Sequence, residues 1–244
     1  MIARSSGLAP QASSPSPVDL HAVADTVNAR LHAPVVRVGP GATPTRGAVS
    51  SGFPALDAAT GLGGFPRGRI TELIGRPTSG CGTVAARTVA AAGGYSAWVD
   101  VPGLVDVDAL ARCGVDLERL FILRPPRTGD ALAVAAQLMA CGQFAVVVLD
   151  ALADLTPGGE TSAAVARFVR VVGPPLGRST TAALVLASPD QHYRSLAHAA
   201  ALRISLARSG LIRRGGVLRG WRAHAQVLKS PGAQGGESGI EVWL

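Results

Sequence analysis

Residues 70–83 read Ile70-Thr-Glu-Leu-Ile-Gly75-Arg-Pro-Thr-Ser-Gly80-Cys-Gly-Thr83, and this stretch decides the fold class. A short segment with the composition of a β-strand is followed by a glycine-rich loop and then by an alanine-rich stretch with the composition of a helix. Strand, loop and helix in this order are the layout of a P-loop, in which backbone N–H groups and a helix N-terminus hold phosphates. Gly75 and Gly80 have the spacing that this layout requires.

The loop lacks the two side chains that give a P-loop its chemistry. A lysine that reaches the phosphates and a Ser or Thr that binds magnesium should follow Gly80, but Cys81 and Gly82 stand there. Thr83 supplies a hydroxyl one residue late, and an arginine cannot replace the lysine within the loop. The alternative is a turn that only packs the helix onto the strand. A vestigial nucleotide site would comprise Gly75, Ser79, Gly80, Gly82, Thr83 and Asp150.

Asp150 enters this set because it ends the apolar segment Phe144-Ala-Val-Val-Val-Leu-Asp150. A strand that ends in a carboxylate is typical of a Walker B segment, where the Asp holds magnesium through water. Such residues are also common as helix caps or turn starters. The position of this strand after the glycine-rich loop favours the first interpretation.

The rest of the chain alternates between strand-like and helical patterns. Apolar runs predict strands at 70–74, 95–99, 120–123, 145–149 and 182–187, with helical stretches near 83–92, 105–113, 129–141 and 160–172. After residue 200, extended segments are expected at 202–207, 211–213, 217–229 and 240–244. The prediction is an α/β fold: a mostly parallel sheet with helices on both faces, extended by antiparallel strands at the C-terminal end.

Residues 1–50 differ from the compact domain that we expect over residues 51–244. Residues 1–17 are rich in Ser, Pro and Ala and predict a disordered tail, and a Pro- and Gly-rich linker precedes the domain. Between them, residues 18–32 predict an amphipathic helix. This helix packs on its own domain, docks on a partner or mediates self-association through its apolar row, Leu20, Val23, Val27 and Leu31.

Composition excludes several classes of protein. The chain has 244 residues, of which 48% are hydrophobic, with 30 Gly that show no three-residue period and 3 Cys. It is therefore not collagen-like, wholly disordered or a disulfide scaffold. Its cysteines lack metal-ligand spacing, so no metal site is predicted. Without a signal segment or membrane span, a cytoplasmic location is expected.

The charge is concentrated near the C-terminal end. The formal net charge is +7, and among the 23 basic residues only Lys229 is a lysine. Residues 191–236 contain no acidic residue. Such a block indicates sequence-independent binding of DNA or binding of an acidic protein surface. Its basic members are Arg194, Arg203, Arg208, Arg213, Arg214, Arg219, Arg222 and Lys229.

Several further landmarks follow one another along the chain. They are Ser51-Gly-Phe-Pro-Ala-Leu-Asp57, Gly63-Gly-Phe-Pro-Arg-Gly-Arg-Ile70, Ala111-Arg-Cys-Gly-Val-Asp-Leu-Glu-Arg-Leu120, Thr128-Gly-Asp-Ala-Leu132 and Val148-Leu-Asp-Ala-Leu-Ala-Asp-Leu-Thr-Pro157. From about residue 50 to Lys229 the chain resembles the core of bacterial RecA recombinases. The resemblance implies a RecA-like P-loop NTPase core.

Departures from the RecA pattern point away from catalysis. The resemblance places Pro102 where a glutamate positions the attacking water, and Cys81 where the P-loop lysine stands. The segment of the first DNA-binding loop is cut to residues 158–160. Lys229 matches one of two lysines that reach a neighbouring subunit's nucleotide, but Pro231 stands at the other position. We expect no enzymatic activity and no cofactor, with weak binding of ATP and magnesium as the alternative.

With these departures the chain resembles the ImuA type of accessory protein, which is related to the SulA division inhibitor. That resemblance implies a non-catalytic role in DNA repair and SOS-induced, error-prone translesion synthesis. The implied partners are a Y-family polymerase-like protein or RecA, with DNA as a further, sequence-independent partner. Two alternatives remain: an ATP-binding or weakly hydrolysing RecA paralogue in recombination, and a SulA-like regulator that binds only protein.

Overall fold

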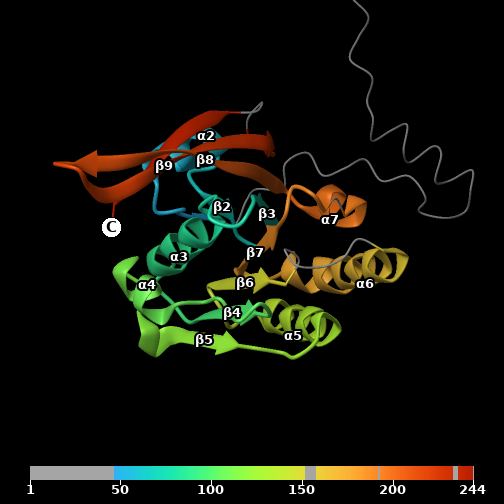
Figure 1. The fold of residues 1–244 in the computed structure, drawn as a ribbon. Helices are drawn as coiled ribbons and strands as arrows, with labels where there is room; N and C mark the ends of the chain where they lie inside the picture. The colour runs from blue at the N-terminus through green and yellow to red at the C-terminus, as the bar shows by residue number, and fades with distance from the viewer. Residues whose placement is uncertain (1–46, 152–157, 192, 233–235, 244) are drawn as a thin grey trace, which may run out of the picture. The chain divides into compact units, whose positions relative to one another are not determined.

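An eight-stranded sheet forms the frame of the part of the chain that the computed structural model describes, residues 47–151, 158–191, 193–232 and 236–243. Its strand order is β10-β9-β8-β3-β7-β6-β4-β5 (Figure 1). The five strands from β3 to β5 in this order are parallel. They are β3 (Ile70–Ile74), β7 (Ala182–Ala187), β6 (Val146–Asp150), β4 (Ser96–Asp100) and β5 (Leu120–Leu123). The predicted strands are thus present, with β4 and β6 shifted by one residue.

The C-terminal strands extend this sheet beyond β3. β8 (Leu202–Arg214) runs parallel to β3 and antiparallel to β9 (Val217–Lys229), which pairs antiparallel with β10 (Glu237–Trp243). Two segments were expected within β8, but the structure has one strand with irregular pairing between Arg208 and Gly210. Gly215 and Gly216 have φ of 57° and 79°, the left-handed backbone that a two-residue hairpin turn requires.

Helices cover both faces of the sheet (Figure 1). On one face, α2 (Pro54–Thr60), α3 (Cys81–Ala91) and α4 (Val107–Arg112) pack into a core with side chains such as Leu73 and Trp98. On the other, α5 (Thr128–Cys141), α6 (Gly159–Leu176) and α7 (Arg194–Ala199) form a second core. Strands that are buried on both sides explain the uninterrupted apolar runs of the sequence. The predicted α/β architecture is confirmed.

The described chain begins slightly before the expected domain start. Ala48–Val49 (β1) pairs with Phe65–Pro66 (β2), so two residues that we had assigned to the linker form a strand. Asp57 accepts a hydrogen bond from the Ser51 N–H at 2.8 Å, which ties this entry segment to α2. The predicted helix at 18–32 lies outside the described residues. Within those residues, no helix has the length and apolar character needed to cross a membrane.

A buried ion pair joins the parallel and antiparallel parts of the sheet. Glu72 on β3 lies opposite Arg203 on β8, and the Arg203 Nε donates to the Glu72 carboxylate. The exposed fractions of the two side chains are 3% for Glu72 and 17% for Arg203. Arg203 in turn pairs in register with Lys229 on β9. Basic residues at this end of β8 and β9 therefore serve the fold.

Candidate functional site

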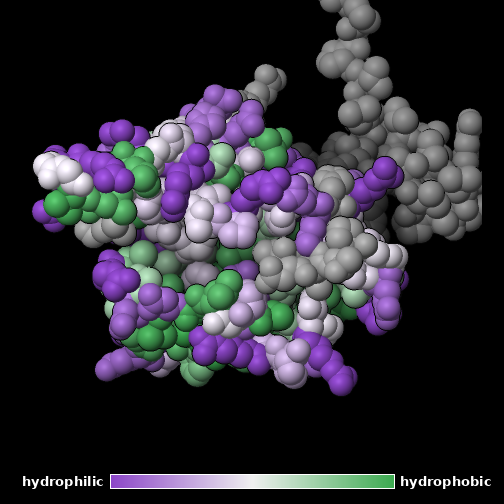
Figure 2. Space-filling model, in the orientation of Figure 1, coloured by the Kyte–Doolittle hydropathy of each residue, from purple (hydrophilic) through white to green (hydrophobic). Residues whose placement is uncertain are grey.

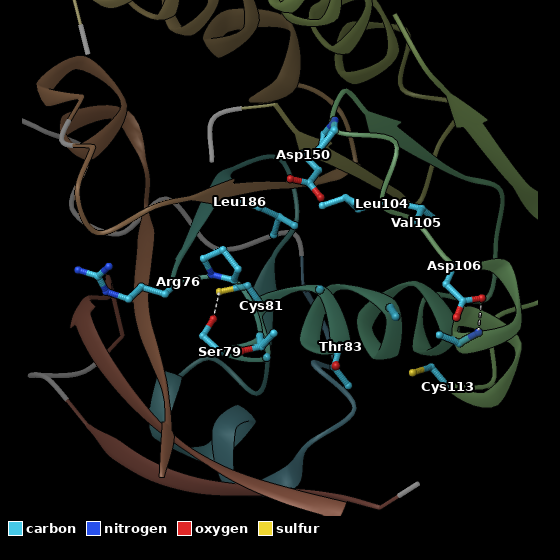
Figure 3. Close-up of a pocket in the computed structure, with 18 of the residues that line it drawn as sticks. Arg76, Ser79, Cys81, Thr83, Leu104, Val105, Asp106, Cys113, Asp150 and Leu186 are labelled. Carbon is cyan, nitrogen blue, oxygen red and sulfur yellow. Dashed lines mark hydrogen bonds between the residues drawn. The ribbon is translucent and has the colours of Figure 1, made fainter. Parts of the chain in front are cut away.

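The glycine loop, residues 75–83, folds its own side chains against Gly75. The Gly75 N–H donates to the Ala187 carbonyl at 2.9 Å, which anchors the loop to β7. A Cβ on Gly75 would lie 2.1 Å from Ser79 Oγ and 2.8 Å from Cys81 Sγ. Ser79 Oγ also donates to Cys81 Sγ at 3.4 Å (Figure 3). Only glycine fits at position 75 because two side chains already fill the space beside it.

The loop reaches α3 through two residues with left-handed backbone. Thr78 and Gly80 have φ of 68° and 110°, and α3 begins directly afterwards at Cys81. Gly82 is exposed, and a Cβ there would meet no atom within 4 Å. In Figure 3, Thr83 points away from Asp150. Arg76 points away as well (Figure 3), and its guanidinium pairs with Asp190 at 2.9 Å.

The thiol of Cys81 lies at the first residue of α3, directly after Gly80. Burial raises the pKa of this thiol to about 11; the hydrogen bond from Ser79 acts in the opposite direction, and the nearby charge of Asp150 raises it further. At neutral pH the thiol is therefore protonated and uncharged. It supplies no positive charge to a phosphate.

A cavity of about 520 Å³ opens beside the loop. Apart from the loop itself, apolar side chains dominate its lining, and the charged groups are Asp106, Asp150 and Arg208. Asp150 comes from the end of β6 and Arg208 from β8. The apolar lining residues are Ala86, Trp98, Pro102, Leu104, Val105, Ala109, Leu110, Leu186, Ala187 and Trp221. Its volume and its mostly apolar lining with a few polar groups lie within the usual range of ligand-binding pockets.

Trp221 of β9 reaches over to the glycine loop. A Cβ on Gly80 would lie 2.5 Å from Cη2 of the Trp221 ring. The guanidinium carbon of Arg208 lies 5.4 Å from the centroid of the same ring, within the range of a cation–π interaction. Trp221 shares a face with the buried Ala223 and Ala225, as the alternation of β9 predicted. Its ring, however, is only partly buried and lines the cavity.

Asp100, at the end of β4, shapes the cavity without lining it. Its buried carboxylate accepts from the N–H groups of Leu104 and Val105 at 3.1 and 3.2 Å. It also accepts from Arg124 Nε at 3.0 Å. These bonds hold residues 101–105, so that Pro102 and Leu104 line the cavity. The sequence analysis did not single out Asp100, although it ends a strand just as Asp150 does.

Comparison with known proteins identifies the origin of this arrangement. Residues 21–173 match the RecA N-terminal domain family. The chain belongs to this family. Over 129 residues, or 52% of this chain, it is 40% identical to Protein RecA of Corynebacterium diphtheriae. Over the same length it is 37% identical to Protein RecA of Frankia alni.

These matches cover only part of each relative. The aligned region spans 35% of the Corynebacterium protein and 37% of the Frankia protein. Membership of the RecA family therefore accounts for the strand order, the glycine loop and the Asp150 strand. It leaves the activity and partners of this chain to be argued from its own residues.

The basic residues that we predicted as one surface divide into two groups in this RecA-family chain. Arg194 begins α7, and Arg203 and Lys229 lie at the end of β8 and β9 nearest to it. Arg203 does not contribute to an exposed patch because it pairs with the buried Glu72. The structure brings the other five together on the distal hairpin, residues 207–222. They are Arg208, Arg213, Arg214, Arg219 and Arg222.

Lys229 caps a helix. Its Nζ donates to the carbonyls of Ala197 and His198 at 3.3 and 2.8 Å, at the C-terminal end of α7. Burial and the charge of Arg203 lower the pKa of this amine, while Glu72 acts in the opposite direction. A cation at a helix C-terminus stabilises the last carbonyls. This contact differs from the role across a subunit interface that the RecA resemblance implied.

Two features of the site escaped the sequence analysis. One is the contact between Trp221 and Gly80, which are far apart in the chain and come together only because β8 and β9 extend past β3. The other is Leu104, an exposed leucine in a loop without periodicity. No group of three or more His, Cys, Asp or Glu residues within the described ranges is placed to hold a metal ion.

Proposed function

We propose that this protein is a non-catalytic, RecA-like accessory factor in DNA repair that acts through protein partners. The observation that carries the proposal is the lining of the cavity at the glycine loop. Cys81 and Pro102 stand where RecA-type catalysis uses a cation and a carboxylate, and apolar side chains surround them. The fold is retained, but the groups for phosphate chemistry are replaced.

Phosphoryl transfer depends on charges placed around the transferred group. A cation and magnesium neutralise the developing negative charge, and a carboxylate or amide orients the attacking water. In the cavity, Asp150 alone matches one of these roles, since Arg76 is paired with Asp190 and Arg208 lies on Trp221. This set of groups supports binding far better than turnover.

The biological role rests on the family and on finer resemblance. RecA homology supports a place in DNA repair or recombination. The entry segment at 51–57, the altered loop and the basic strand that ends at Lys229 resemble accessory proteins of the ImuA type. We therefore assign the protein to damage-induced, error-prone translesion synthesis, with a Y-family polymerase-like protein or RecA as partner.

Two other functions compete with this proposal. Asp150 and the spacing of Gly75 and Gly80 favour a RecA paralogue that binds ATP or hydrolyses it slowly. The concentration of arginines on the distal hairpin favours a SulA-like regulator that binds an acidic protein surface. The paralogue would have to bind nucleotide in a magnesium-dependent manner. The SulA-like regulator would act without any role in DNA synthesis.

ATP turnover by the purified full chain is the direct biochemical test. We expect none above background, in the wild type and also in Cys81→Lys/Gly82→Thr, because Pro102 still supplies no carboxylate. Magnesium-dependent hydrolysis that Asp150→Ala removes would contradict the proposal. In cells, deletion of this protein should abolish ultraviolet-induced mutation. Expression of the Cys81→Ala variant in the deletion strain should restore it, because the proposed role needs no catalysis.

A further inference from the structure

Exposed apolar residues lie in the lining of the cavity and on the distal hairpin, where Leu211 pairs with the lining residue Trp221. Leu104 is 78% exposed, and Leu211 and Leu218 on the distal hairpin are 46% and 43% exposed. Exposed apolar side chains that adjoin a cavity mark interaction sites more often than isolated ones do. In the space-filling view, hydrophobic and hydrophilic side chains mix over this hairpin (Figure 2).

Strand register shows which hairpin residues share the side of Trp221. Leu211 on β8 is the partner of Trp221, and paired residues project from the same face of a sheet. Arg213, two residues after Leu211, is on this face too, together with its own partner Leu218. The cavity side of the hairpin therefore carries three large apolar side chains next to Arg208 and Arg213.

The charges around the cavity are unequal. Residues 193–232 contain no acidic residue, and of the hairpin arginines Arg222 pairs with Glu241 of the neighbouring β10, so the positive charge beside the cavity comes from Arg208 and Arg213. Across the cavity, Asp106 caps α4: its Oδ1 accepts from the N–H groups of Asp108 and Ala109 at 2.9 and 3.2 Å. Asp106 is thus partly neutralised by the helix it caps, and Asp150, the other carboxylate of the lining, lies at the end of β6, with β3 and β7 between it and β8. The guanidinium of Arg208, on the hairpin side, lies on an aromatic ring. An occupant with negative charge toward the hairpin fits this arrangement.

A nucleotide fits it less well. The Trp221 ring lies against Gly80, in the part of the loop where a P-loop surrounds phosphates. The Cys81 side chain packs beside Gly75, and Arg76 is directed to Asp190. A bulky apolar side chain, in contrast, would bury its surface against Leu104, Leu110 and Trp221.

We propose that this cavity binds an acidic, apolar-anchored peptide segment of a protein partner. One bulky apolar side chain of the segment enters the cavity, and flanking Asp or Glu residues pair with Arg208 and Arg213. The inference rests on the proposed function as a partner-binding factor and specifies the chemistry of that partner. A helix or an extended segment can present such a side chain.

Selection from a random 12-residue peptide library displayed on phage tests this inference with the full chain as bait. We expect enriched peptides to share one Trp, Phe or Leu flanked by Asp or Glu. A fluorescent copy of the most enriched peptide then serves as the probe. Ala109→Trp, which fills the cavity, should weaken its binding at least tenfold. Leu104→Asp, an exposed position that should not disturb folding, should weaken it similarly by repelling the acidic flanks.

Charge is tested separately from shape. Arg208→Ser/Arg213→Ser should weaken the probe about tenfold at low salt, and the loss should shrink as salt rises. Arg167→Ser/Arg170→Ser removes the same charge from α6 on the other face of the sheet and should leave binding unchanged. Equal losses in both double variants would overturn the inference, because they would reflect net charge alone.

Other outcomes overturn the inference in different ways. Binding that survives both Ala109→Trp and Leu104→Asp, or a selection without any enrichment, would exclude the cavity as a peptide site. Displacement of the probe by ADP would restore a nucleotide site and would also contradict the proposed function. Displacement of the probe by single-stranded oligo-dT would indicate that the cavity is a DNA site. A failed selection combined with absent ATP turnover would remove only the peptide inference.

Discussion

The glycine loop and the distal hairpin line the same cavity, but they differ in the contacts that hold them and in the side chains that they expose. The loop is short, held by backbone contacts and by the side chains of Ser79 and Cys81, and its single arginine pairs outward with Asp190. The hairpin is a long extension with five arginines and three exposed apolar side chains. The loop is thus fixed by its own contacts, while most of the exposed charged and apolar groups lie on the hairpin.

This difference shows how a fold can change its ligand. Replacing one or two loop side chains removes the charges that phosphate requires, and the strand and helix on either side still pack as before. A sheet edge extended by antiparallel strands can add new surface without disturbing that core. The two regions meet where the Trp221 ring lies against Gly80, and this contact decides whether they act together.

The largest effect is expected at the ion pair that joins the two parts of the sheet. Arg203→Met leaves the Glu72 carboxylate buried without its partner, and losing one member of such a pair lowers the free energy of unfolding by about 3–5 kcal/mol. Urea unfolding measures this change. Glu72→Gln/Arg203→Met should recover most of the loss, since neither side chain is then charged. Equal destabilisation in the single and double variants would show that packing, not charge, joins the two parts.

A somewhat smaller effect is expected in the loop at alkaline pH. The pKa of Cys81 is about 11 in the folded chain, against 9.0 for an unperturbed thiol. The folded chain therefore holds this proton more tightly than the unfolded chain does. Its stabilising effect is complete below pH 9 and is lost as the pH rises to 11, by about 2–3 kcal/mol in total.

The control for this prediction is Cys81→Ala. Between pH 9 and 11 the wild type should lose more stability than this variant, which lacks the thiol but keeps Cys113 and Cys141. Unfolding by urea at a series of pH values measures both. Parallel curves would mean that Cys81 is accessible to water, and the loop would then be more open than the hairpin contact implies.

Most of the fold could be predicted from the sequence because its signals are local. Apolar runs such as 146–149 become strands buried on both faces, and the alternation from Trp221 to Val227 becomes a strand with one wet face. The order of the strands within the sheet was not predicted, because periodicity does not give it. The single long β8 was missed because polar residues at Arg208 and Ser209 interrupt its pattern where the pairing is irregular.

The site was harder to predict because its residues meet through the tertiary structure. The sequence shows that no lysine follows Gly80, but it does not show which side chains lie beside the loop instead. Trp221 reaches Gly80 from the far side of β8, and Leu104 is held by Asp100 through backbone hydrogen bonds. The basic block was correctly noted as a charge feature. The block divides into two groups because Arg203 pairs with Glu72 and Lys229 donates to carbonyls at the end of α7. Counting charges along the sequence does not reveal these contacts.

The contact between loop and hairpin is tested at two neighbouring glycines. Gly80→Ala places a Cβ 2.5 Å from the Trp221 ring at a φ of 110°, so the free energy of unfolding should fall by about 2 kcal/mol. Gly82→Ala meets no atom within 4 Å and should change stability by less than about 0.5 kcal/mol. In a Trp221→Ala background, Gly80→Ala should lower the free energy of unfolding by less, because only the cost of the left-handed backbone at residue 80 remains. Additive losses would show that the hairpin does not press on the loop.

The smallest expected effect concerns DNA, and it asks whether the distal hairpin binds phosphates as well as protein. Binding should be independent of sequence and should weaken as salt rises, because it depends on the release of counterions. Arg213→Ala/Arg214→Ala should lower affinity about tenfold, or ~1.4 kcal/mol, for every duplex alike, and reduce the salt slope by up to ~2. Fluorescence anisotropy with two unrelated duplexes measures both quantities, with Arg167→Ala/Arg170→Ala on α6 as the matched control. If the control pair lowers the slope equally, the attraction comes from net charge and the hairpin has no special part in it. If no binding occurs even at low salt, the arginines of the hairpin serve a protein partner, and the contrast between a loop whose one arginine is paired outward and a hairpin rich in arginine reflects protein recognition alone.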